Sequence, residues 1–384
     1  MDLHSISIRH FAAMAATVRH GSLTQAARAV NLTQPALSQA ISRLESQLEC
    51  ALFDRGPAGM SPTEPATLLT PRAETAISHI GSTRVTGTQM RAFLALARGG
   101  SYASASEATG LSAASLHRAV ADLSVALGQR LVERRGRSVI LTRAGQRRAR
   151  GFGLAMAELR AGIDEISAWQ GKAAGRVVIG AMPLSRARWL PAVIARFTRK
   201  WPGVDISVIE GSYSEMAGPL RDGDIDCLLG ALRDSTAEDD LAQEAVFDDR
   251  PVVIMRTGHP LLNLTQISAQ DFSQYPWILP SRSTPLRHYW EDMFLSCGVT
   301  PPHVGVECGS VLTTRQLLLA GDALTLLSPE QLWVELEGKV LTSCPPPAEV
   351  RRTIGIITRT GWRPTPPQTD LLTILREVGI QFNS

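Results

Sequence analysis

Residues 21–55 read GSLTQAARAVNLTQPALSQAISRLESQLECALFDR, and residues 100–134 read GSYASASEATGLSAASLHRAVADLSVALGQRLVER. These two stretches align without a gap. One three-residue gap extends the match to residues 8–66 and 90–145. The period of about eighty residues is too long for a stacked repeat protein, so the chain carries two copies of one small domain.

The composition is that of a globular protein. The chain has 384 residues, of which 44% are hydrophobic and 20% are charged, and this length allows roughly two to four domains. Because there is no run of about eighteen apolar residues and no apolar leader at the N-terminus, we expect a cytoplasmic protein with no membrane partner. The five cysteines form no CxxC pair, which indicates neither a zinc site nor a disulfide framework.

Charge divides the chain into a basic front and an acidic rear. Residues 1–150 carry a net charge of +9, with arginine as the only cation, whereas residues 151–384 carry −6. This division is typical of a nucleic-acid-binding part joined to a part that avoids nucleic acid. An uneven surface charge without a function is the alternative at this point.

The first copy predicts three short helices followed by a hairpin. Apolar residues within 8–18 recur at helical spacing and stop before Gly21. Ser22 is placed to cap a second, shorter helix. Thr33 is placed to cap a third helix, whose apolar residues run at i, i+4, i+7 and i+11 and define its buried side. The Gly- and Pro-rich residues 56–59 then form the tip of a small β-wing.

The third helix leaves a polar face outward at its N-terminal end. A helix of this kind fits the major groove of DNA, where glutamine pairs with adenine edges and serine or threonine adapts to several bases. Arg55, at the start of the wing, is placed for a phosphate. A plain three-helix bundle that contacts another protein has the same periodicity and stays open as an alternative. The outward residues are Gln34, Ser38, Gln39, Ser42 and Arg43.

The first copy resembles the DNA-binding domain of LysR-type transcriptional regulators. The resemblance rests on Phe11, Leu44, Glu45 and Leu48 and on the segments 21–27, 32–41 and 52–55. It implies that Arg55 begins the wing. It also implies that the groove-facing start of the recognition helix consists of Thr33, Gln34, Pro35, Ser38 and Gln39.

The second copy keeps the apolar scaffold and loses the reading face. Ala113-Ala114 stands where the first copy has Gln34-Pro35, and His117-Arg118 stands where it has Ser38-Gln39. Arginines without a base-reading helix favour phosphate contacts, which position a protein without reading sequence. A degenerate copy kept for packing or dimerisation is the open alternative. The arginines of this second, more basic wing are Arg134, Arg135 and Arg137.

The rear half begins with one long helix over residues 143–170. In LysR-type regulators such a helix pairs with a partner subunit, so the resemblance implies a dimerisation helix; a buried helix within the chain is the alternative. From residue 175 onward short strands alternate with helices, which predicts a parallel α/β sheet. Pieces near 175–180, 220–226 and 252–261 resemble the LysR-type effector domain. That resemblance implies two lobes with a ligand cleft, as in periplasmic solute-binding proteins.

The expected fold is therefore an α/β multidomain chain with two helical winged heads. We expect lobe one at about 173–256 and 350–384, and lobe two at about 257–349. The predicted parts are a winged helix-turn-helix domain at 1–66, a connector at 67–87, a second, degenerate winged helix-turn-helix domain at 88–145, a linker or dimerisation helix at 146–172 and an effector-binding domain at 173–384.

Candidate ligand residues follow the strands of the rear half. Ligands of open α/β sheets lie beyond the carboxyl ends of strands, where helix N-termini favour anions. With Arg282 nearby, this argument favours an anion or a polyhydroxy ligand, although an ordinary helix cap competes at each position. The candidate effector-binding residues are Pro183, Leu184, Ser185, Gly230, Ala231, Leu232, Ser281, Arg282, Ser283 and Ser310, with Arg233, Thr284 and Gly309 beside them.

Taken together, these patterns predict a ligand-responsive transcriptional regulator. Its expected partners are double-stranded DNA, a small-molecule effector and further copies of the chain as a dimer or tetramer, with RNA polymerase as a candidate partner. The chain has no GxxxxGK[ST], HExxH or GxSxG motif and no metal-ligand cluster, so we expect no enzyme activity, no cofactor and no metal. A DNA-silent protein whose heads only oligomerise is the alternative.

Overall fold

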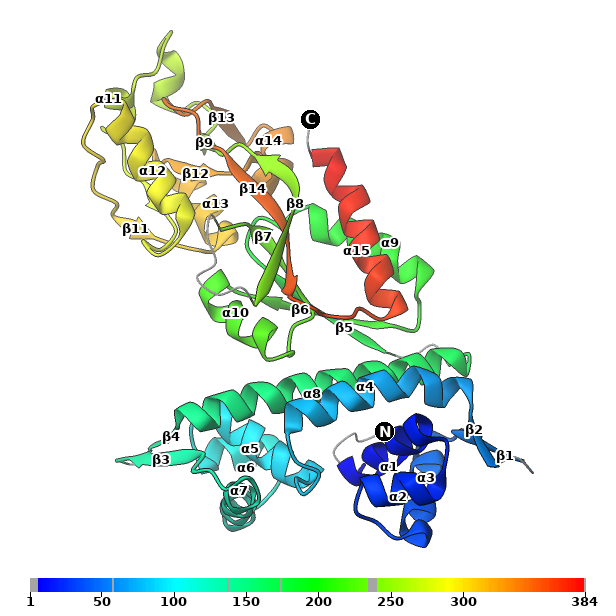
Figure 1. Cartoon of the computed structure of the whole chain (residues 1–384). Helices are drawn as coiled ribbons and strands as arrows, with labels where there is room; N and C mark the ends of the chain where they lie inside the picture. The colour runs from blue at the N-terminus through cyan, green and yellow to red at the C-terminus, as the bar shows by residue number, and fades with distance from the viewer. Residues whose placement is uncertain (1–5, 57–58, 137, 173–174, 234–239, 383–384) are drawn as a thin grey trace. The chain divides into compact units, whose positions relative to one another are not determined.

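The chain forms two compact units in the computed structural model, which describes residues 6–56, 59–136, 138–172, 175–233 and 240–382 (Figure 1). The first unit contains the described residues up to Arg176 with two short segments from further on. The second unit contains most of the chain from Val177. No helix of the described residues is long and apolar enough to cross a lipid bilayer.

The first head, as we call residues 8–62, is a three-helix domain with a β-wing. Ser7 caps α1 by accepting a hydrogen bond from Arg9 N, and Gly21 ends α1 in the left-handed conformation at φ 62°. Phe11, Leu37 and Leu44 are buried where the three helices meet. The elements are α1 (Ile8–His20), α2 (Leu23–Ala29), α3 (Gln34–Leu48), β1 (Phe53–Gly56) and β2 (Gly59–Pro62). This agrees with the helices and wing expected from the apolar spacing.

The second head, residues 87–141, repeats the same order of elements. Phe93, Leu116 and Leu123 are buried among its three helices. Each helix again begins after a Thr or Ser cap. Each helix of this head is also followed by a glycine with positive φ. The elements are α5 (Gly87–Gly99), α6 (Tyr102–Thr109), α7 (Ala113–Leu127), β3 (Val132–Arg135) and β4 (Ser138–Leu141).

A long helix follows each head, and the two helices pack together. α4 (Glu64–Ile80) follows the first wing and α8 (Arg143–Trp169) follows the second. They lie side by side (Figure 1), and the buried face between them contains Leu69, Ala76 and Leu159. We expected a connector at 67–87. The structure instead has a helix of 17 residues, Glu64–Ile80, that covers most of this segment.

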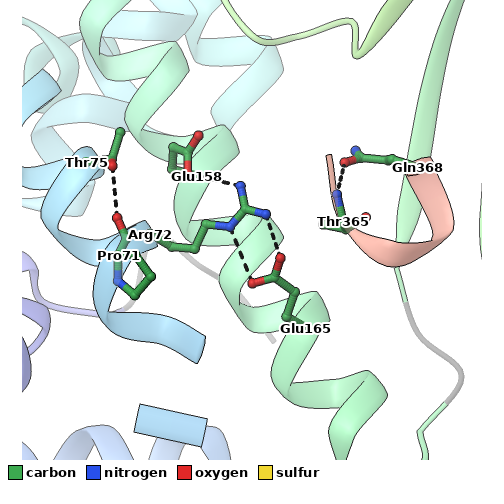
Figure 2. Close-up of polar contacts among 7 residues, drawn as sticks. All are labelled: Pro71, Arg72, Thr75, Glu158, Glu165, Thr365 and Gln368. Carbon is green, nitrogen blue, oxygen red and sulfur yellow. Dashed lines mark hydrogen bonds and ion pairs between the residues drawn. The ribbon is translucent and has the colours of Figure 1, made fainter. Parts of the chain in front are cut away.

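Pro71 explains why helix α4 is hard to recognise from sequence. A proline inside a helix removes one backbone donor and normally indicates a break. In α4 the helix continues through Pro71, and the Thr75 hydroxyl donates a hydrogen bond to the Pro71 carbonyl at 2.9 Å (Figure 2). The packing of the apolar face against α8 outweighs the local cost of the proline.

Lobe one of the second unit is a five-stranded sheet with the order β6-β5-β7-β14-β8. β5 and β7 run parallel, whereas β14 runs antiparallel to both β7 and β8. α9 and α15 pack against each other. The elements are β5 (Arg176–Ala181), α9 (Trp189–Lys200), β6 (Asp205–Glu210), α10 (Tyr213–Arg221), β7 (Cys227–Ala231), β8 (Leu241–Asp249), β14 (Arg352–Arg359), α15 (Pro366–Gly379) and η4 (Ile380–Phe382).

Lobe two holds a three-stranded antiparallel sheet, β12-β9-β13, and a short parallel pair, β10-β11. Its core contains Trp277, Trp290 and Phe294 in edge-to-face contact. The elements are β9 (Val252–Arg256), η2 (Pro260–Asn263), α11 (Ala269–Phe272), β10 (Ile278–Leu279), α12 (Pro285–Ser296), β11 (Val306–Glu307), α13 (Val311–Ala320), β12 (Thr325–Leu327), η3 (Pro329–Leu332), α14 (Trp333–Glu337) and β13 (Leu341–Cys344).

The chain crosses between the lobes twice. β8 belongs to the sheet of lobe one and β9 to the sheet of lobe two, so the first crossing lies at about residues 250–251. We expected this boundary at about residue 256, because an apolar strand alone does not reveal which sheet it joins. β14 returns the chain to lobe one and lies within residues 350–384, which were expected to belong to that lobe.

Candidate nucleic-acid interface and ligand cleft

The start of α3 is an exposed polar surface. Thr33 caps the helix by accepting a hydrogen bond from Ala36 N at 3.4 Å, and Pro35 lies in the first turn, where the missing N–H costs nothing. Leu37, Ile41 and Leu44 are buried on the opposite side. Ser38 is half-buried, and the other expected reading residues are exposed: Thr33, Gln34, Pro35, Gln39, Ser42 and Arg43.

Glu45 connects α3 to the first wing. Its Oε1 accepts hydrogen bonds from Leu52 N at 2.9 Å and from Phe53 N at 3.3 Å. The second head has Ser124 at this position, and the Ser124 hydroxyl donates to the Val120 carbonyl of its own helix at 2.9 Å. The first wing is therefore fixed to its helix by a contact that the second wing lacks.

The end of α8 contacts the C-terminal end of α3. Gln170 Nε2 donates hydrogen bonds to the carbonyls of Leu48 and Glu49, both at 3.2 Å. Lys172 forms an ion pair with Glu49 at 2.8 Å. The last carbonyls of a helix have no partner within the helix, so these contacts satisfy them. Residues Gln170 and Lys172 thus hold the C-terminal end of α3.

The two wings are only partly described. Arg134 is exposed in β3. Arg55 in β1 and Arg135 in β3 have described backbones, but their side chains fall outside the described residues, as does all of Arg137. Of the expected wing arginines, Arg134 is therefore the one whose side chain the structure places at the surface.

The corresponding face of the second head is exposed and largely apolar or basic. Ala113, Ala114, His117 and Arg118 are exposed on α7. The His117 ring lies against Tyr102 from α6, with ring centroids 5.2 Å apart. At these four positions the second head offers one guanidinium and one imidazole, where the first head offers two amides and one hydroxyl.

A cleft of about 580 Å³ separates the two lobes of the second unit. Four of the expected effector residues line it: Pro183, Leu184, Ala231 and Ser281. Arg233, Thr284 and Gly309, which were placed beside them, also line it. The cleft therefore lies where the strand-end argument placed a ligand.

The other expected effector residues do not line this cleft. The Ser185 side chain is buried, and its hydroxyl donates to the carbonyls of Met182 at 2.8 Å and Leu229 at 3.2 Å. Ser310 caps α13 by accepting a hydrogen bond from Thr313 N. Those that lie away from the lining are Ser185, Gly230, Leu232, Arg282, Ser283 and Ser310.

Two arginines bring positive charge into the cleft, whose lining also contains Arg186 and the carboxylates Glu210, Glu215 and Glu307. Arg233 lies 4.7 Å from the ring centroid of Tyr213, and burial lowers the pKa of Arg233. Among the described residues, no carboxylate pairs with it. Arg352 has a side chain that is only 10% exposed, and its Nε donates to Asp249 at 2.6 Å. Its Nη2 is buried and has no hydrogen-bond partner among the described residues.

Arg352 and Tyr213 line the cleft but were not among the residues expected from the sequence. Arg352 lies at the start of β14, the strand that returns to lobe one. The expected ligand residues were taken only from segments that follow the carboxyl ends of strands. Tyr213 begins α10 after the second strand of the lobe, where the same argument, applied to every strand end, finds it. Glu210 also lines the cleft and forms an ion pair with Arg186 there.

Two family descriptions match the chain. "Bacterial regulatory helix-turn-helix protein, lysR family" matches twice, over residues 8–67 and residues 88–146. "LysR substrate binding domain" matches residues 170–379. The two matches of the first description coincide with the two heads and the start of the helix after each.

Individual relatives differ in how much of the chain they cover. The HTH-type transcriptional regulator GalR of Pseudomonas putida is 31% identical and covers 93% of this chain and 94% of its own length. The HTH-type transcriptional regulator PcaQ of Agrobacterium fabrum is 24% identical and covers 77% of this chain and 95% of its own length. The match to GalR leaves out fewer residues than one head contains, whereas the match to PcaQ leaves out more than one head contains.

A solved structure has the same fold over most of the chain. A full-length OxyR variant from Pseudomonas aeruginosa superposes with a TM-score of 0.55 at 22% sequence identity. It covers 78% of this chain and 99% of its own length. At this level of identity the likeness concerns the arrangement of helices and strands and not the residues of either site.

Proposed function

The chain belongs to the LysR family of bacterial transcriptional regulators, and we propose that its two heads have different tasks on DNA. The first head reads the bases of an operator half-site. The second head contacts phosphates and carries little sequence information. The observation that carries this proposal is the contrast between the exposed polar start of α3 and the alanine, histidine and arginine face of α7.

The side chains of each face determine what it can recognise. Gln34 and Gln39 present amides, which can form paired hydrogen bonds with an adenine edge, and Ser38 and Ser42 present hydroxyls. The methyl groups of Ala113 and Ala114 offer no hydrogen bonds to a base edge. Arginine contacts to phosphate increase affinity for every sequence and make it depend on salt.

The test is a salt titration of DNA affinity with two double variants. Duplexes come from the intergenic region upstream of the chain's own gene, with a scrambled duplex as the comparison. We expect Gln34→Ala/Ser38→Ala to reduce the preference for the upstream duplex by about 1–3 kcal/mol per lost base contact. We expect Arg118→Ala/Arg134→Ala to keep that preference and to lower the salt slope by roughly two phosphate contacts.

Two results would contradict this division of tasks. If the arginine variant loses sequence preference while the α3 variant keeps it, the two heads have exchanged roles. If neither variant changes affinity or preference, the heads do not bind DNA through these faces. Gln25→Ala on α2, an exposed residue of the same head, is the control for an unspecific loss of stability.

We also propose that the effector is a carboxylate with an apolar body. Arg233 has no carboxylate partner among the described residues, and Arg352, which also lines the cleft, has a buried donor without a hydrogen-bond partner among them. A buried donor without a partner costs about 1–3 kcal/mol, which an acceptor oxygen of the ligand would recover. Leu184, Leu286 and Val311 supply apolar surface around these two arginines.

Thermal shift and calorimetric titration with two ligand sets test this proposal. The first set contains aliphatic and aromatic monocarboxylates, and the second contains uncharged sugars of similar size. We expect binding only in the first set, and a loss of at least tenfold in affinity for Arg233→Gln and for Arg352→Gln. Arg282→Gln, an exposed arginine outside the cleft, is the matched control and should bind as the wild type does. Binding of sugars that is unaffected by either cleft variant would contradict it.

A further inference from the structure

The duplicated part of the chain is longer than the winged head. Each copy consists of three helices, a two-stranded wing and one long helix. The joint between wing and long helix is also repeated. The hydroxyl of Thr63 donates to the Ala51 carbonyl at 2.8 Å, and that of Thr142 donates to the Arg130 carbonyl at 2.7 Å. Each long helix is therefore fixed to its own wing in the same way.

The two long helices run antiparallel. Trp169 Nε1, at the end of α8, donates to Glu64 at the start of α4 at 3.0 Å. Near the opposite end, a Cβ at Gly151 would meet the carbonyl oxygen of His79 at 2.7 Å, so this glycine allows the backbones to approach closely. Two copies of one unit joined through antiparallel equivalent helices are related by an approximate two-fold axis across the pair.

A buried ion-pair cluster connects the middle of the pair. Arg72 on α4 forms two hydrogen bonds with Glu165, at 2.5 and 3.3 Å, and one with Glu158 at 3.2 Å. Figure 2 shows the guanidinium between the two carboxylates of α8. The three side chains are between 6% and 14% exposed. α4 of the same chain thus covers the face of α8 that carries Glu158 and Glu165.

The antiparallel arrangement places the two wings at opposite ends of the helix pair. The first wing precedes α4, whose first residue contacts the last residue of α8, and the second wing precedes the first residue of α8. The 27 residues of α8 correspond to roughly 40 Å at about 1.5 Å per residue. This is of the order of one turn of B-DNA, about 34 Å, which is how two-headed regulators space their half-sites.

We propose that a single chain is the complete DNA-binding unit, with an internal pair of heads in the place of a dimer of heads. The site that it covers consists of two successive half-sites in a fixed order, one read by α3 and the other contacted by the second head. A two-fold-symmetric pair of identical heads favours a palindrome. A pair with unequal faces favours a site without that symmetry. This inference rests on the proposed function, because it requires both heads to face DNA.

Tethered DNA cleavage on the full chain tests the inference. Ser61→Cys in the first wing and Ser138→Cys in the second are exposed positions that carry an iron chelate without disturbing either core. We expect cleavage from position 61 at the half-site read by α3. We expect cleavage from position 138 about one turn of the DNA helix away from that half-site, and on one side of it only. The wild-type chain, labelled at exposed Cys297, gives the background.

The stoichiometry of the complex is the second measurement. We expect one short duplex per chain by native mass spectrometry, whether or not chains associate through other surfaces. One duplex per two chains, or cleavage from position 138 equally on both sides of the half-site, would overturn the internal pair. Cleavage from position 61 without any from position 138 would also overturn it, while leaving the reading role of the first head intact. No binding at all would instead refute the proposed function.

Discussion

At the scale of single residues, Glu45 shows how one side chain sets the geometry of a head. Its carboxylate accepts hydrogen bonds from two backbone N–H groups at the start of the wing. These hydrogen bonds attach the wing to the helix. Replacing Glu45 by Ala leaves those two N–H groups without their partner, and we expect a loss of about 1–3 kcal/mol in the free energy of unfolding. Urea denaturation measures this change.

The same substitution should also affect DNA binding. We expect Glu45→Ala to weaken affinity for every duplex and to preserve the preference for the upstream sequence, because the wing and not the reading face is displaced. Ser124→Ala at the equivalent position of the second head is the matched control. Its hydroxyl bonds only within its own helix, so a change of less than about 0.5 kcal/mol is expected there. Equal effects of the two variants would contradict the role of Glu45.

Because of His259, we expect the free energy of unfolding of lobe two to depend on pH. Its side chain is 1% exposed, and its Nδ1 accepts from Leu261 N while Nε2 faces the Asp322 carbonyl at 3.2 Å. Burial is the main cause that lowers the pKa of His259; Asp322 opposes this and Arg256 adds to it. The folded state therefore favours the neutral ring more than the unfolded state does.

The sign of the effect follows from this lowered pKa. The contribution is fully present above the unfolded pKa of about 6.5 and is lost as the pH falls through the lower folded pKa. We expect the free energy of unfolding to decrease less between pH 7.5 and 5.5 in His259→Asn than in the wild type. Asn retains an oxygen for the Leu261 N–H but does not titrate. Identical pH profiles for the two proteins would contradict this prediction.

Residue positions were predictable where a regular period determines which way a side chain points. The exposed reading residues of α3 follow from the buried leucine and isoleucine spacing on the same helix. Residues after strands have no such period. The sequence therefore predicted the loops that line the cleft but not which of their side chains line it. Ser185 turns inward to two carbonyls, whereas its neighbour Leu184 lines the cleft.

At the scale of elements, the pair of α4 and α8 was the least predictable feature. The apolar positions of residues 143–170 predicted α8, the family resemblance implied pairing with a partner subunit, and a buried helix within the chain was the alternative. The pairing with α4 could not be derived from the period, because Pro71 interrupts the helical pattern and small alanines supply much of the contact. Long-range burial decides such cases, and it is not encoded in any short window of sequence.

The ion pairs of Arg72 provide a test of this element. Burial favours a lower pKa for Arg72, but hydrogen bonds and charge from Glu165 and Glu158 outweigh it and raise the pKa. Removing the arginine alone takes a positive charge away from two buried carboxylates. We expect Arg72→Met to reduce the free energy of unfolding of the first unit by about 3–5 kcal/mol.

A second variant separates charge from packing in the same place. Arg72→Met/Glu158→Gln/Glu165→Gln removes the charges together, so we expect it to recover most of the lost stability. Far-UV circular dichroism during urea denaturation measures both variants. If the triple variant is less stable than Arg72→Met, the carboxylates contribute through contacts other than the arginine, and the charge argument fails.

At the scale of the whole molecule, the two units have separate hydrophobic cores. The described core of the first unit ends at Ile166, and the cores of the second begin at Val178. Chains built from such units do not unfold in one cooperative step. A ligand that binds one unit in its folded state raises the stability of that unit, by about 2.7 kcal/mol at a hundred times its dissociation constant.

This division can be measured with DNA as the ligand. Of the seven tryptophans, Trp169 alone belongs to the first unit, so in Trp169→Phe the tryptophan fluorescence reports only the second unit. Its indole is 48% exposed, and the substitution removes one hydrogen bond to Glu64. Helix-dominated circular dichroism of the same variant also reports the first unit, which contains most of the long helices.

We expect a random-sequence duplex at low salt to shift only one of the two transitions. Phosphate contacts bind any duplex at low ionic strength, so the operator need not be known. The urea midpoint of the dichroism transition should rise with DNA concentration, while the midpoint of the fluorescence transition should stay constant. At high salt both midpoints should return to their values without DNA. If the fluorescence midpoint rises in parallel at low salt, DNA binding stabilises the effector-binding unit too, and the two units are energetically coupled.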